Sequence, residues 1–263
     1  MSQSLLKTGL SLPFTESELK NIEYIPECFE YVELSGEALA DMVELRKTHP
    51  LWSEFEFCNF RNIISSNLTC QLTSENKVIV QEYKKQLREL FSQAMKCKAG
   101  FVSIDPDWET LCSDSDRMKI FADVLSSTAG DRNFYNIELL ISVRLPGSGA
   151  VPATESLQML RKLPSHRVKL ALDINPHELI NSNIEWGKLL RKFRFDAPVI
   201  RFCYASELGN KLLYSHIGAV IEELKKLNQE FFIYLAPSGK ADLEELAETA
   251  QAINGKSNDE SQR

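Results

Sequence analysis

The feature that most constrains this chain is a repeated alternation between short apolar runs and longer amphipathic stretches. Eight runs rich in β-branched or aromatic residues recur, and each is followed by a segment with helical periodicity. Such alternation is typical of α/β proteins built around a parallel sheet. The expected strands are residues 6–14, 29–35, 67–73, 99–105, 137–145, 167–174, 197–205 and 230–237.

Amphipathic segments fill the intervals between these strands. The clearest runs from residue 78 to 97, where apolar side chains recur at steps of three and four residues. Eight strand–helix units in one chain predict a single closed (β/α)8 TIM barrel over residues 1–253, followed by a disordered polar tail at 254–263. The expected helices are residues 16–22, 36–49, 78–97, 114–128, 153–163, 177–193, 212–228 and 240–253.

The composition of the chain indicates which binding partners and which cellular compartment to expect. The chain has 263 residues, is 43% hydrophobic and carries a formal net charge of −7. An acidic surface argues against broad binding to nucleic acid or anionic membranes, and no apolar run approaches the roughly 20 residues of a membrane span. The six cysteines form no zinc or disulfide motif. We therefore expect a cytoplasmic protein with reduced thiols, and leave open whether it forms a homo-oligomer.

The segment Leu51 to Asn67, "LWSEFEFCNFRNIISSN", interrupts the regular pattern. It is long and rich in aromatic residues, and we expect it to be a loop between a helix and the third strand. In a TIM barrel such a loop lies at the bottom, away from the usual active site. Packing under the barrel is the favoured interpretation, and binding to a partner protein is the alternative.

Three short motifs resemble the xylose isomerase-like barrels, the sugar-phosphate isomerase/epimerase superfamily. "KTGLSLPF" resembles the first strand of that family, "FEYVELSG" its second and "LALDINPHE" its sixth. The resemblance extends over residues 6–253. It implies a barrel that acts on a small sugar, with carboxylates and histidines at the strand C-termini holding a divalent metal and paired glutamates moving protons.

The chain departs from that family pattern at two strands. The fifth strand ends "LLISVRLPG" and the eighth "FFIYLAPSG", and neither carries the glutamate that is usual there. Loss of both glutamates would remove metal ligands and the acid/base pair together, and hard cations need several oxygen ligands. We therefore expect no cofactor and no tightly bound divalent ion; a metal at the mouth is the less favoured alternative.

Charged residues end three consecutive expected strands. Arg144, Asp173 and Arg201 follow apolar runs, so we expect them to meet at the C-terminal mouth of the barrel. One interpretation is an ion-pair cluster that holds the mouth together. The other is an anion-binding pocket, because arginine suits carboxylate or phosphate. After Asp173, Asn175 and Pro176 are read as the cap and first residue of a helix.

Other residues at the expected mouth complete the candidate site. Glu33 and Asp173 are the candidate catalytic acid and base. Ser238 and Lys240 follow the last strand and could cradle a phosphate at a helix start, although a plain helix cap explains them as well. The candidate substrate-binding residues are Arg144, Arg201, Asp105, Trp108, His177, Tyr204, Ser238 and Lys240.

Two hypotheses about function follow. The first is a divergent sugar or sugar-phosphate isomerase/epimerase-like barrel that binds a small polar or anionic ligand at its mouth, with the family metal site degraded. The second is a non-catalytic barrel that binds a metabolite or a partner protein. Neither nucleic acid nor a membrane is an expected partner.

Overall fold

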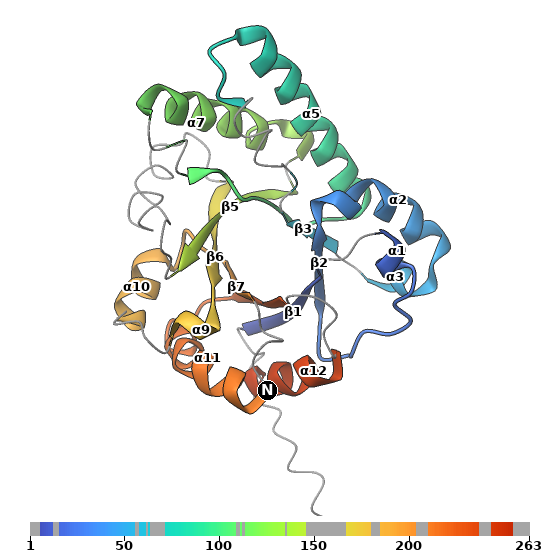
Figure 1. Cartoon of the computed structure of the whole chain (residues 1–263), viewed down its shortest axis with the longest axis vertical. Coiled ribbons are helices and arrows are strands. Elements are labelled where there is room, and N and C mark those ends of the chain that lie inside the picture. The colour runs from blue at the N-terminus through green and yellow to red at the C-terminus, as the bar shows by residue number, and fades with distance from the viewer. Residues whose placement is uncertain are drawn as a thin grey trace, which may run out of the picture.

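The strands form one closed barrel (Figure 1). The structure is a computed structural model that describes residues 6–12, 16–55, 58–61, 63, 72–108, 111, 114–134, 136–145, 167–179, 185–203, 210–236 and 243–254. Eight parallel strands pair in chain order, and β8 pairs with β1. This confirms the predicted (β/α)8 fold. The strands are β1 (Leu6–Leu12), β2 (Tyr31–Ser35), β3 (Cys58–Arg61), β4 (Phe101–Ile104), β5 (Glu138–Leu145), β6 (Val168–Ile174), β7 (Val199–Cys203) and β8 (Phe231–Ala236).

Helices surround the strands on the outside (Figure 1). Two begin at side-chain caps: Asn76 accepts the Val78 N–H before α5, and Asp114 accepts the Asp116 N–H before α7. The described helices are α1 (Glu16–Leu19), η1 (Gly36–Ala38), α2 (Leu39–Thr48), α3 (Pro50–Glu54), α5 (Lys77–Lys96), α7 (Ser115–Ala129), η2 (Arg132–Phe134), α9 (Pro176–Leu179), α10 (Trp186–Phe193), α11 (Asn210–Lys225) and α12 (Leu243–Ile253).

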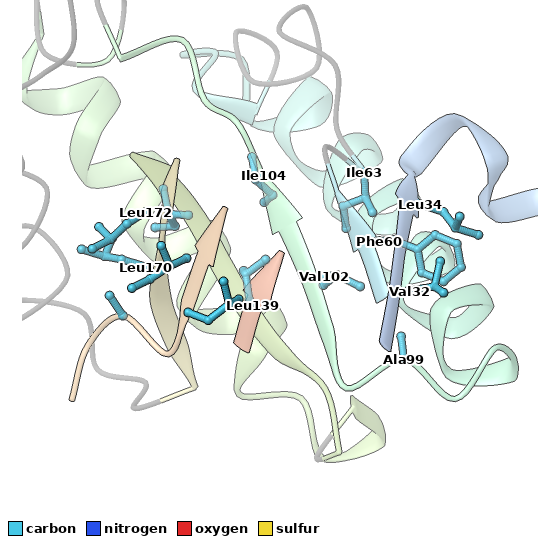
Figure 2. Packing of buried hydrophobic residues seen from close by; sticks show 14 of the residues in the cluster. Val32, Leu34, Phe60, Ile63, Ala99, Val102, Ile104, Leu139, Leu170 and Leu172 are labelled. Carbon is cyan, nitrogen blue, oxygen red and sulfur yellow. The ribbon is translucent and has the colours of Figure 1, made fainter. Parts of the chain in front are cut away.

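The main hydrophobic core lies between the strands and the helices. Alternate strand residues such as Leu170 and Leu172 of β6 belong to it, and Figure 2 shows them with neighbouring core residues. Helix α5 contributes Leu87 and Phe91, which are fully buried. The intervening strand residues therefore face the barrel axis, as the period of two along a strand requires.

The third strand differs from the prediction. Cys58–Arg61 forms β3, within the segment expected to be a loop under the barrel. Phe60 packs beside Val32 and Leu34 of β2 (Figure 2). The strand expected at 67–73 is therefore wrong: Leu72 is helical, and 67–71 lie outside the described residues. The physical reason is that β3 is only four residues long and turns two polar side chains inward, so it lacks an apolar run.

The segment after β6 forms two described helices rather than one. Pro176 is the first residue of α9, as expected, but the helix predicted over 177–193 is divided, because Glu185 is not helical and α10 begins at Trp186. The helix expected at 153–163 and most of the tail at 254–263 lie outside the described residues. No described helix has the length and apolarity needed to cross a membrane.

Beneath the mouth, side chains fill the barrel interior. Tyr234 of β8 lies across the axis, where a Cβ added to Gly9 would come within 2.5 Å of its ring. Glycine at this position of β1 therefore makes room for the tyrosine. Leu140, Ala171 and Val199 pack with Tyr234 in a separate apolar cluster. This apolar layer fills part of the barrel interior.

Asn59 joins the short third strand to its neighbours. Its Oδ1 accepts the backbone N–H groups of Gly100 at 2.9 Å and Phe101 at 2.8 Å, and its Nδ2 donates to the Tyr234 hydroxyl at 2.7 Å. The β3–β4 ladder is short, and Phe60 pairs in register with Val102. The Asn59 carboxamide therefore satisfies backbone groups that a longer ladder would pair.

We expect Asn59→Ala to lower the free energy of unfolding by about 1–3 kcal/mol, because it leaves two backbone donors without an acceptor. Tyr234→Phe removes only the hydroxyl that accepts from Asn59 and serves as the matched control, with a smaller loss. Urea denaturation followed by circular dichroism measures both. Equal losses for the two variants would contradict this role.

Candidate functional site

The C-terminal mouth of the barrel holds a buried charged network. Glu33 of β2, Asp173 of β6 and Arg201 of β7 have exposed fractions of 1%, 4% and 0%. Asp173 is next to last in β6, Glu33 and Arg201 are the central residues of β2 and β7, and all three face the axis. The sequence placed Asp173 and Arg201 together, and the structure also brings in Glu33 from the opposite side of the barrel.

Arg201 is the centre of this network. Its Nε and Nη2 donate to Glu33 Oε2 and Oε1 at 2.7 and 2.6 Å. Its Nη1 donates to Asp173 Oδ1 at 2.9 Å and to Ser142 Oγ at 3.3 Å, and Nη2 also donates to Ser103 Oγ at 2.9 Å. A guanidinium has five N–H donors. Every donor of Arg201 therefore has an acceptor.

The electrostatics of Arg201 follow from these contacts. Burial by itself would lower the pKa of Arg201, but the charges of Glu33 and Asp173 and their hydrogen bonds outweigh it, so the pKa is raised. Ser11 Oγ donates to Glu33 Oε2 at 2.8 Å and holds that carboxylate in place. Arg201 thus stays charged in a site without solvent contact, where an unpaired charge would be costly.

A second arginine, Arg61, joins the network from the end of β3. Its Nη2 donates to Asp173 Oδ2 at 3.0 Å and approaches Cys203 Sγ at 3.8 Å. Its side chain is 23% exposed, whereas that of Asp173 is 2% exposed. Arg61 was not among the predicted site residues, because the third strand was expected farther along the chain. The signal available in the sequence was the alternation Cys-Asn-Phe-Arg.

Arg144 does not take the place expected for it. Its backbone is the register partner of Asp173. Its guanidinium, however, pairs with Asp105 at 2.9 Å, and its side chain is 68% exposed. We expected Arg144 and Arg201 to flank Asp173, and this was wrong for Arg144. The arginines that form ion pairs with Asp173 are Arg201 and Arg61. The physical reason is that Ser142, two residues earlier on β5, occupies the level of the Arg201 guanidinium, which leaves Arg144 at the rim.

Trp108 is nearly buried and packs in the hydrophobic core. Its Nε1 donates to the Ser142 carbonyl at 3.0 Å, and it is 9% exposed. This bond ties the segment after β4 to β5. Tyr204, Ser238 and Lys240 lie outside the described residues, as does the side chain of His177 on α9. Their predicted roles in binding remain predictions.

The described residues at the mouth do not offer a set of ligands for a divalent cation. Both oxygens of Glu33 and both oxygens of Asp173 accept hydrogen bonds from arginines. Within the described residues, no group of three or more His, Cys, Asp or Glu side chains could hold a metal. A guanidinium thus lies between the two acids that a cation at the mouth would need.

Solved structures resemble this chain, whereas no protein-family model and no curated protein matches it. A D-psicose 3-epimerase crystallised with D-fructose aligns with TM-score 0.65 and 14% identity over 95% of this chain and 97% of its own. The 3-keto-D-glucoside 4-epimerase from E. coli aligns with TM-score 0.61 and 11% identity, over 96% and 100%. An AP endonuclease, family 2, from Brucella melitensis aligns with TM-score 0.57 and 14% identity, over 94% and 97%. This chain shares the TIM-barrel fold of these proteins. At these identities the likeness establishes the fold alone.

We expect Arg201→Ala to lower the free energy of unfolding by about 3–5 kcal/mol, because it leaves Glu33 and Asp173 buried without their shared partner. Arg144→Ala is the matched control, since it removes an arginine of the neighbouring rim whose exposed ion pair is worth less than about 1 kcal/mol. Urea denaturation compares them. Similar losses for both variants would contradict a central role for Arg201.

Cys203 provides a test of the electrostatics at the mouth. Burial and the charge of Asp173 together raise the pKa of its thiol to about 11, although Arg61 and Arg201 oppose the shift. A raised pKa keeps the thiol protonated at pH 8, and only the thiolate reacts quickly. We expect alkylation of Cys203 by iodoacetamide at pH 8 to be roughly 100-fold slower than in the urea-unfolded chain, and to accelerate toward pH 11. Peptide mapping by mass spectrometry measures both rates, and equal rates would refute the shift.

Proposed function

We propose that this protein is a divergent sugar isomerase/epimerase-like barrel that binds a sugar or sugar phosphate at its C-terminal mouth without the family's divalent metal. The observation that carries the proposal is the Glu33–Arg201–Asp173 network at the face where TIM barrels place their active sites. The network sits in a fold shared with sugar epimerases.

Net charge helps to choose among the structural neighbours. An endonuclease has the same fold, so the fold by itself is compatible with more than one substrate class. The formal net charge of −7 disfavours a polyanionic nucleic acid and leaves a small ligand as the better choice. The described cysteines 58, 97 and 203 form no disulfide bond, which supports our inference of a cytoplasmic location.

A non-catalytic binding barrel is the second candidate, and one observation favours it. A general base needs a lone pair within reach of the substrate proton. Glu33 accepts two hydrogen bonds from Arg201, and Asp173 is shared between Arg201 and Arg61. Proton transfer by either acid would require that network to open when the ligand binds.

Binding and turnover can be measured separately. We expect D-fructose, D-psicose or their phosphates to raise the melting temperature, with or without EDTA, because no metal is needed to hold them. For turnover, NMR in D2O follows both the appearance of an isomeric sugar and the exchange of the hydrogen next to the sugar carbonyl.

The possible results separate the two candidates. Exchange or isomer formation that is lost in Asp173→Asn or Glu33→Gln supports an enzyme, whereas binding without either supports the non-catalytic barrel. Failure of a broad panel of sugars and sugar phosphates to bind would refute the proposed function. Binding that requires an added divalent ion would refute its metal-free form.

A further inference from the structure

We propose that Arg61 is the anion anchor of the mouth, and that the ligand carries an oxyanion, either a carboxylate or a phosphate. The inference rests on the proposed function, in that it assumes a small ligand at the mouth. It goes beyond it by naming the residue and the chemical group that meet there.

The position of Arg61 suits this role. It is the last residue of β3 and pairs in register with Ser35 at the end of β2, so it lies at the C-terminal edge of the barrel. Its side chain is 23% exposed, whereas that of Arg201 is fully buried. Of these two arginines, Arg61 is therefore the one that a ligand from solvent can touch.

Counting hydrogen-bond donors separates the two arginines. All five donors of Arg201 have acceptors. Arg61 uses only Nη2, toward Asp173 and Cys203. Its Nε is buried and has no partner, and its Nη1 makes no hydrogen bond to any residue that the structure describes. Three of its N–H donors are thus unmatched. Of these donors, the Nε group is buried, and buried donors without partners are rare and costly.

The neighbouring acceptors cannot supply the missing partners. Glu33 is held by Arg201 and Ser11, Asp173 is shared by the two arginines, and Asp105 pairs with Arg144 at the rim. The three arginines and three acids cancel in charge, so an incoming anion meets no net repulsion. These six side chains offer no further acceptor oxygen to Arg61. A carboxylate or phosphate supplies two or more acceptor oxygens, in the bidentate geometry that a guanidinium recognises.

Arg61→Lys tests the anchor, because lysine keeps the positive charge beside Asp173 and loses the planar fork. Calorimetry would compare D-fructose with D-fructose 6-phosphate, and D-glucose with D-gluconate. We expect the charged member of at least one pair to bind the wild-type protein about tenfold or more tightly, and Arg61→Lys to abolish that gain while leaving affinity for the neutral sugar unchanged. The two pairs distinguish phosphate from carboxylate.

Arg88→Lys is the matched control, since Arg88 forms an exposed ion pair with Asp131 on the helical layer. If Arg61→Lys fails to fold, the wild-type protein still provides a test. Phenylglyoxal modifies accessible arginines, and mass spectrometry should show that the tighter-binding charged sugar protects Arg61 and leaves Arg88 reactive.

The outcomes separate this inference from the proposed function. If neutral sugars bind, and charged sugars bind no better or lose nothing in Arg61→Lys, the anchor is refuted and the proposed function stands. If no sugar binds, neutral or charged, both are refuted. If a charged sugar binds tightly without protecting Arg61, the anion is held elsewhere and the anchor is refuted.

Discussion

The buried Arg201 guanidinium is the interaction on which the architecture of the mouth depends. It receives acceptors from β2, β4, β5 and β6 while its own backbone belongs to β7. A charge removed from water is tolerated only when paired and fully hydrogen-bonded, and this one is. One side chain thus links five of the eight strands above the apolar layer around Tyr234.

The same interaction decides what chemistry the mouth can carry. Glu33 and Asp173 face each other across the barrel axis, where two acids could share a cation or a substrate proton. Here they share a guanidinium, whose positive charge and fixed fork satisfy both carboxylates at once. A mobile divalent ion can act as a Lewis acid, whereas a saturated guanidinium cannot open a coordination position. The two acids therefore act first as supports, and only a ligand that rearranges the network could use them otherwise.

The barrel was predictable because seven of its strands are apolar runs followed by periodic helices, and a parallel sheet buried on both faces produces that pattern. Asp173 and Arg201 were predictable as partners because they are charged residues within apolar runs on consecutive strands, which pair in register. Strand β3 could not be predicted, because only Cys58 and Phe60 face the helical core, whereas Asn59 and Arg61 face the axis. The position of the Arg144 side chain was missed for another reason. The sequence indicates that a residue lies near a strand end, but it does not give the level of that residue along the barrel axis relative to residues of neighbouring strands.

The contrast between Arg61 and Arg201 shows how a supporting arginine differs from one that can bind. Both lie at the mouth, both contact Asp173, and burial by itself would lower the pKa of each while nearby acids raise it. Charge and location therefore do not distinguish them. Hydrogen-bond satisfaction does, because a guanidinium with five acceptors has nothing left to offer, whereas one with unmatched donors near solvent gains most from an added acceptor. In a barrel where an arginine occupies the space between the central acids, the capacity to bind thus shifts outward, from the axis to the rim.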